Sequence, residues 1–217
     1  MESVSESSQG AGALRSYGGE AGDARVARRR AALLDATLDL LSDAQSGPVT
    51  VRGICTRAGL TPRYFYESFE NVDVLVGETY DGVISEIADR AWLAFDAGDT
   101  PRDKVTAAVR AIIDVIDSDA RKGRLIFSDT MGSPVVAERR ATSLQLFATL
   151  TSKSAQQVSR FRNDDELMAA SHFQVGGLGR VLASWTEGRL DIERERLVMI
   201  CARMLWPEPR SATAGDR

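Results

Sequence analysis

Apolar residues recur three and four positions apart along most of the chain, and this spacing places them on one side of an α-helix. In the first clear example Leu34, Leu38 and Leu41 share a face, while charged residues occupy other positions of the same segment. No segment shows the sustained alternation of apolar and polar residues that is typical of a half-buried β-strand. The pattern therefore predicts an all-α protein.

Helix-capping residues divide this pattern into about nine helices. Thr50 is a suitable N-cap, Gly59 suits the left-handed position after a helix, and Thr61 stands directly before Pro62 at a first helical position. The predicted helices cover residues 25–45, 51–58, 62–68, 72–97, 101–118, 119–130, 134–161, 164–188 and 192–206. We expect them to pack in two layers.

Residues 50–69 fit a helix-turn-helix, because two short helices are joined by a three-residue turn that contains glycine. On the second helix Phe65 and Phe69 fall on one side, which we expect to face a core, and Arg63 falls on the other. Arginine can bind the O6 and N7 atoms of guanine, and Thr and Tyr hydroxyls can bind phosphates. The alternative is an exposed ion pair between Arg63 and Glu67. The candidate DNA-binding residues are Thr50, Arg52, Thr61, Pro62, Arg63, Tyr64, Tyr66 and Ser68.

Positive charge is concentrated in the same part of the chain. The whole sequence has 27 Lys and Arg against 31 Asp and Glu, which gives a net charge of -4. Residues 25–66 nevertheless hold seven arginines and three aspartates, a local charge of +4 that leaves -8 elsewhere. A basic segment on an acidic protein is typical of a nucleic-acid-binding head. Its densest cluster, which either contacts DNA or is a solvated helical turn, comprises Arg25, Arg28, Arg29 and Arg30.

The run TVRGICTRAGLTPRYFYESFENVDVL, residues 50–75, resembles the signature of the tetracycline-repressor family. The matching positions are Ile54, Ala58, Gly59, Leu60, Thr61, Phe65, Tyr66, Phe69 and Leu75. The sequence departs from the family at Val72, where a phosphate-binding Lys is usual, and at Ser68, where His is frequent. The resemblance implies a homodimeric transcription regulator that binds double-stranded operator DNA, acts as a repressor, and is released by a small apolar effector.

The resemblance also implies how the chain is divided. We expect a helix-turn-helix DNA-binding domain over residues 25–72 and a ligand-binding and dimerisation domain over residues 73–207. The composition of residues 1–24 predicts a disordered tail, and residues 208–217 form a C-terminal tail.

Two groups of residues are candidates for the functions of the larger domain. The resemblance places effector binding between residues 72 and 161, where the aromatic side chains either line a pocket or form ordinary core. These candidate effector-binding residues are Trp92, Phe95, Phe127 and Phe147. The resemblance places dimerisation in the last two helices, where small residues allow close approach and a large ring can be buried. The candidate dimer-interface residues are Gly176, Gly177, Gly179 and Trp185.

Other functional classes have less support. The single histidine, His172, has no nucleophile or acid at a spacing that suggests a catalytic group, so we expect no enzyme. Cys55 and Cys201 stand far apart, and we expect no metal and no cofactor. The sequence shows neither a secretory signal nor a membrane-spanning run, so we expect a cytoplasmic protein without a membrane partner. A helical interaction module, or an activator of the same fold with altered DNA binding, is the alternative function.

Overall fold

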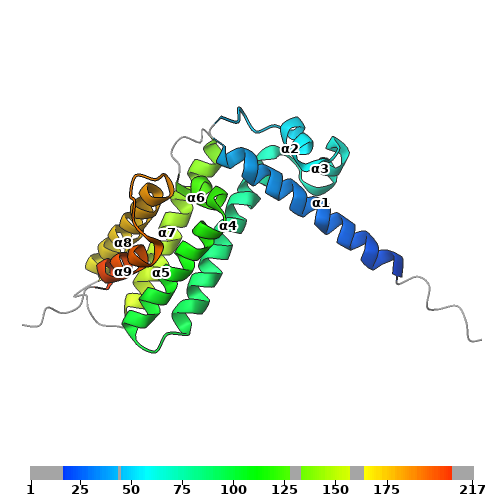
Figure 1. Cartoon of the computed structure of the whole chain (residues 1–217). Coiled ribbons are helices and arrows are strands. Elements are labelled where there is room, and N and C mark those ends of the chain that lie inside the picture. Colours follow the sequence, from blue (N-terminus) through cyan, green and yellow to red (C-terminus); the bar gives the residue numbers. More distant parts are fainter. Residues whose placement is uncertain (1–16, 44, 128–132, 157–163, 207–217) are drawn as a thin grey trace, which may run out of the picture.

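The structure is a computed structural model that describes residues 17–43, 45–127, 133–156 and 164–206. Within these ranges the chain forms nine helices and no strand, which confirms the predicted all-α fold (Figure 1). The helices are α1 (Tyr17–Ser42), α2 (Val51–Ala58), α3 (Pro62–Ser68), α4 (Val72–Asp96), α5 (Pro101–Ser118), α6 (Ala120–Phe127), α7 (Pro134–Gln156), α8 (Asp164–Thr186) and α9 (Arg194–Leu205).

A small head is formed by α1, α2, α3 and the start of α4. Its core consists of buried side chains from all four helices, and Leu33, Ile54, Phe65 and Leu75 are fully buried in it. Burial of such side chains stabilises the head by roughly 1.5 to 3 kcal/mol each. The short helices α2 and α3 are too short to be stable alone, so this packing against α1 holds them in place.

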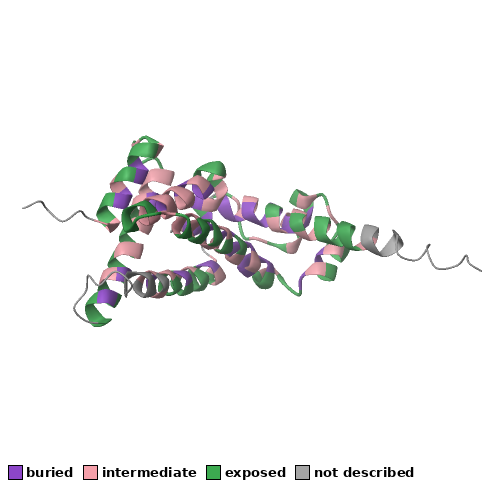
Figure 2. Ribbon diagram, turned by 90° about the horizontal axis from the view of Figure 1, so that it is seen from below, coloured by how far each residue is buried: buried purple, intermediate pink, exposed green. Residues whose placement is uncertain are grey.

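The body contains the rest of α4 and helices α5 to α9. One core cluster joins α4, α5, α6 and α7 with the end of α1, and a second joins α5, α8 and α9. In Figure 2 the buried positions lie along the inward sides of the helices, while the outward sides are exposed. Helix α4 belongs to both the head and the body, because Leu75 packs in the head core and Val83 and Ile87 pack in the body core.

Several helix boundaries differ from the sequence prediction. Helix α1 begins at Tyr17, so residues 17–24 are helical rather than part of a disordered tail. Helix α9 begins after Glu193 and not after Asp191, because the Glu193 carboxylate accepts hydrogen bonds from the backbone N–H groups of Glu195 and Arg196, each at 3.0 Å. The predicted ends of the helices over 119–130 and 134–161, and most of both predicted tails, lie outside the described residues.

Candidate nucleic-acid interface and ligand cavity

The turn between α2 and α3 is built as the sequence predicts. The hydroxyl of Thr50 accepts a hydrogen bond from the backbone N–H of Gly53 at 3.2 Å and caps α2. Gly59 ends α2 with φ = 65°, a left-handed conformation that glycine adopts without strain. Thr61 occupies the N-cap position of α3 before Pro62, but its side chain makes no capping hydrogen bond.

Helix α3 presents one buried and one exposed side. Phe65 and Phe69 are buried in the head core, as the helical wheel predicts. Arg63 and Tyr66 are exposed, and the Tyr66 ring stands edge-on to Phe65 with ring centroids 5.2 Å apart. The remaining candidate DNA-binding residues divide into exposed Thr50, Arg52, Thr61 and Pro62, and half-buried Tyr64 and Ser68. All eight lie on α2, α3 or their N-caps.

The ion pair that was the alternative interpretation of Arg63 is present. Arg63 Nε donates to Glu67 Oε1 at 3.0 Å, yet the Arg63 side chain is 84% exposed. An ion pair this exposed is worth only a few tenths of a kcal/mol. The pair therefore does not prevent Arg63 from turning toward another partner.

Two arginines of α1 fasten this helix to the helix-turn-helix, a role that the sequence did not indicate. The Arg29 guanidinium lies 4.4 Å from the centroid of the Tyr64 ring, and its Nη2 is 3.8 Å from Glu67 Oε2. Arg30 pairs with Glu78 of α4 and lies 4.8 Å from the centroid of the Phe69 ring. Cation–π and ion-pair contacts of this kind each contribute about 0.5 to 1 kcal/mol.

The body contains a cavity of about 940 Å³ that is partly open to solvent and is lined by residues of α4 to α9. All four aromatic residues predicted as effector-binding candidates lie in its wall: Trp92, Phe95, Phe127 and Phe147. The Trp92 and Phe95 rings are stacked with centroids 6.1 Å apart, and Lys104 Nζ lies 5.3 Å from the centroid of Phe95. A cavity of this size, with mostly apolar walls, is typical of a site for a drug-sized organic molecule.

The cavity wall also contains a few polar side chains, among them Tyr80, Arg140 and Ser143. Tyr80 is almost fully buried. Burial raises the pKa of its hydroxyl, against smaller opposing contributions from a hydrogen bond with Ser143 and from the charge of Arg140. These groups can orient a polar end of a bound molecule.

The four candidate dimer-interface residues do not share one surface. Gly176 and Gly177 are exposed on α8, and a Cβ atom at either position would meet nothing within 4 Å. At Gly179 a Cβ atom would instead meet the Phe127 ring at 3.8 Å. Trp185 packs against the core between α5, α8 and α9, where its indole N–H donates to the carbonyl oxygen of Ile192 at 2.9 Å. Exposed apolar side chains on α8 and α9, which sequence reasoning did not single out, are Met168, Phe173, Met199 and Met204.

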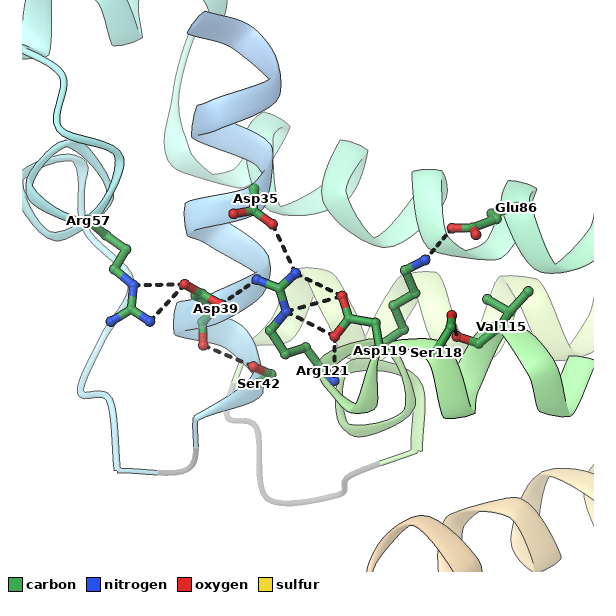
Figure 3. Close-up of polar contacts among 10 residues, drawn as sticks. Asp35, Asp39, Ser42, Arg57, Glu86, Val115, Ser118, Asp119 and Arg121 are labelled. Carbon is green, nitrogen blue, oxygen red and sulfur yellow. Dashed lines mark hydrogen bonds and ion pairs between the residues drawn. The ribbon is translucent and has the colours of Figure 1, made fainter. Parts of the chain in front are cut away.

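A cluster of ion pairs joins the head to the body through Arg121 of α6 (Figure 3). Arg121 donates to Asp119, the residue directly before α6, at 2.8 to 3.2 Å, and to Asp39 of α1 at 2.5 Å. Asp35 of α1 is a third partner at 3.0 Å. The Asp39 carboxylate also accepts from Arg57 of α2, whose Nε lies 2.8 Å away. One aspartate on α1 therefore links an arginine of the helix-turn-helix to an arginine of the body.

The electrostatics of this cluster favour its charged state. Hydrogen bonds from Arg121 lower the pKa of Asp39 and that of Asp119, although partial burial opposes both shifts. The same hydrogen bonds, first from Asp119 and then from Asp39, raise the pKa of Arg121. All three groups are therefore ionised at neutral pH.

Helix α6 touches both the head and the cavity. At its beginning Arg121 binds α1, and Arg124 Nε donates to the carbonyl oxygen of Ser42 at 3.1 Å. At its end Ile126 and Phe127 line the cavity. A displacement of this eight-residue helix by a molecule in the cavity would therefore act directly on the last turns of α1.

Within the described ranges no three His, Cys, Asp or Glu side chains gather as a metal site would require. None of the helices in those ranges combines the length and apolar character needed to cross a bilayer.

No protein-family model matches the chain. A segment of 82 residues, 38% of the chain, is 33% identical to the HTH-type transcriptional regulator BetI of Rhizobium meliloti (strain 1021). The match spans about 40% of the length of that relative.

Solved structures match over most of the chain. The fatty acid degradation regulator FadR from Bacillus halodurans is similar over 84% of this chain and 96% of its own, with a TM-score of 0.71 and 14% identity. A TetR family transcription regulator from Marinobacter aquaeolei VT8 is similar over 85% and 96%, with a TM-score of 0.63 and 18% identity. The protein has the TetR-family fold.

Another structure with this fold was solved with a ligand. FadR from Bacillus subtilis in complex with stearoyl-CoA is similar over 80% of this chain and 96% of its own, with a TM-score of 0.66 and 11% identity. Residues 50–75 resemble the tetracycline-repressor family, and the fold that this resemblance implied is thus confirmed.

Proposed function

We propose that the protein is a homodimeric, sequence-specific DNA-binding regulator, a repressor whose affinity for its operator is lowered by a small, largely apolar ligand. The observation that carries this proposal is the joint presence of an exposed recognition helix, α3, and a large cavity that meets the head through α6. In this proposal residues 25–72, with the start of α1, form the DNA-binding unit, and residues 73–207 bind the ligand and the second subunit.

In this proposal the candidate DNA-binding residues of the head divide into base-reading and phosphate-binding side chains. Arg63 reads a base edge in the major groove, because it is the one basic residue of α3 and its side chain is exposed. Thr50, Tyr66 and the free N–H groups at the starts of α2 and α3 bind phosphates and set the position of the head. Arg52, Thr61, Pro62, Tyr64 and Ser68 complete the contact surface.

The DNA-binding proposal is tested with the full chain and duplex DNA. Binding to random-sequence and genomic fragments is measured by fluorescence anisotropy between 50 and 200 mM salt, and an operator is selected from the fragments that bind. Steep weakening with salt is expected, because phosphate contacts release counterions. Failure to bind any duplex at low salt would reject the proposal and favour the helical interaction module.

The ligand in this proposal binds among α4 to α8 and changes the separation of the two heads. A dimer must fit half-sites about 34 to 36 Å apart, so a small tilt of α4 or α6 is enough to weaken binding. The stearoyl-CoA complex of Bacillus subtilis FadR makes acyl-CoA thioesters the first compounds to test. Isothermal titration calorimetry of the wild type is compared with Ala108→Phe, which fills the cavity wall with a ring.

Reciprocity gives the ligand proposal a strict test. If a ligand weakens operator binding, the operator must weaken ligand binding by the same factor, typically about 5- to 150-fold. A ligand that binds wild type but not Ala108→Phe, with an affinity that the operator reduces, supports the proposal. A ligand affinity unchanged by the operator would contradict regulation through this cavity.

A further inference from the structure

The four arginines near the start of α1 divide into two pairs. Arg29 and Arg30 are occupied, because they bind Tyr64, Glu67, Phe69 and Glu78. Arg25 and Arg28 are exposed, and neither makes a hydrogen bond or an ion pair with any residue in the described ranges. Of these four arginines, Arg25 and Arg28 are therefore the two without a partner among the described residues.

The position of α1 places Arg25 next to the recognition helix, and Arg28 lies beside Arg25, three residues further along α1. Arg25 lies one helical turn before Arg29, and side chains four residues apart share a helix face about 6 Å from each other. Arg29 contacts Tyr64 of α3, so the side of α1 that bears Arg25 borders the exposed surface of α3. Figure 1 shows that the beginning of α1 extends past α2 and α3.

Charge compensation separates the two pairs further. Glu67 and Glu78 offset the charges of Arg29 and Arg30. Between residues 22 and 30 the one acidic residue is Asp23. This segment therefore retains a net positive charge from Arg25 and Arg28. The first turn of α4 contains no basic residue, and Val72 at its start packs partly into both core clusters.

We propose that Arg25 and Arg28 form a second DNA contact, in which their guanidinium groups bind backbone phosphates beside the groove that α3 enters. This inference rests on the proposed function. Arginine binds phosphate through paired, charge-assisted hydrogen bonds. Because Arg29 and Arg30 already hold the helix against the head, the contact requires little ordering of the backbone on binding.

The experiment compares the salt dependence of DNA binding by the wild type and by Arg25→Gln/Arg28→Gln. Each phosphate contact contributes about 0.9 to the slope of log K against log salt, so removal of four arginines from a dimer should lower the slope by about 3.6. The decrease in DNA affinity should be similar for the selected operator and for random duplex. The melting temperature should stay within about 1 °C of wild type, because surface changes without partners have small effects on stability.

Two control variants separate this contact from other effects of charge. Arg90→Gln/Arg189→Gln removes two positive charges from exposed ion pairs of the body and should leave the slope unchanged. Arg29→Gln removes a fastening contact and should lower the melting temperature, which Arg25→Gln/Arg28→Gln should not do.

Three results would overturn the inference. An unchanged slope in Arg25→Gln/Arg28→Gln would show that these arginines touch no phosphate. A loss confined to the operator, with random duplex bound normally, would show that they read sequence instead. Failure of the wild type to bind any duplex would remove the proposed function and this contact with it, whereas the first two results leave the proposed function standing.

Discussion

Replacement of Arg121 by Gln should remove the ion pairs between the head and the body without disturbing either core. The guanidinium has three carboxylate partners, but they do not contribute equally. Asp39 is its strongest long-range partner, since both side chains are largely shielded from solvent, with exposed fractions of 28% and 19%. Asp35 is 63% exposed and contributes only a few tenths of a kcal/mol. Asp119 belongs to the same local turn.

The expected loss of stability follows from these contacts. A hydrogen bond between charged groups contributes roughly 1.5 to 3 kcal/mol when shielded, and solvent screening reduces this for groups that are partly exposed. Asp39 also keeps its hydrogen bond from Arg57 in the variant. We therefore expect Arg121→Gln to cost about 2 kcal/mol, which lowers the melting temperature of a chain of this size by about 4 to 8 °C.

The assay is thermal unfolding followed by circular dichroism at pH 7, with Arg90→Gln as the matched control. Arg90 forms an exposed ion pair with Glu86 within α4, and its removal should cost less than about 0.5 kcal/mol. A double-mutant cycle with Asp39→Asn should show a coupling of at least about 1 kcal/mol. A melting temperature within 1 °C of wild type, or additive single variants, would refute the view that this cluster joins head and body.

The change of stability with pH tests the same cluster independently. The pKa values of Asp39 and Asp119 are lowered in the folded protein. Their stabilising contribution is therefore present above the pKa of an unfolded aspartate, about 3.9, and is lost as pH falls below it toward the lowered folded values. Wild type and Arg121→Gln should converge in stability as the pH is lowered from 5 toward 3. A difference that stays constant over this range would contradict the assignment.

Three further predictions test the caps, the recognition helix and the dimer. Thr50→Ala should lower stability by about 1 kcal/mol in urea unfolding, whereas Thr61→Ala should have a much smaller effect because Thr61 makes no side-chain cap bond. Arg63→Ala should cost about 1 to 3 kcal/mol on the operator by anisotropy and little on random duplex, and equal losses on both would contradict base reading. Gly177→Glu should give monomers in sedimentation while Gly82→Glu, equally open on α4, stays dimeric; a dimeric Gly177→Glu would place the interface elsewhere.

The sequence predicted the local features of the site well, because their chemistry is local. The N-cap at Thr50, the left-handed Gly59 and the buried side of α3 depend on residues within one or two turns, and all three are present. The start of α1 was placed eight residues too late, because Gly18, Gly19 and Gly22 are poor helix formers. For Trp92 the sequence did not decide between a position in the core and a position in a cavity wall. The packing of several helices places it in a cavity wall.

Contacts between distant segments could not be predicted from the pattern. Arg121 and Asp39 are 82 residues apart, and Arg30 and Glu78 are 48 apart. Any of the chain's 31 acidic residues was an equally good partner on charge alone. The same holds for apolar contacts such as that of Trp185. Its helix was predicted, but which face of that helix packs against α9 depends on the tertiary packing.

Two physical routes connect the cavity to the head, and they respond differently to substitution. Helix α4 passes from the head core to Trp92 as one continuous helix, so it transmits a tilt whatever the charges around it. Helix α6 acts on α1 through the hydrogen bonds of Arg121 and Arg124 and through the apolar cluster that the two helices share. If α6 is the main route, Arg121→Gln should reduce the factor by which a cavity ligand weakens operator binding toward one, while ligand affinity in the absence of DNA stays near that of wild type. If α4 is the main route, the same variant should lose stability and keep the full coupling, because the contacts of α4 with both cores are untouched.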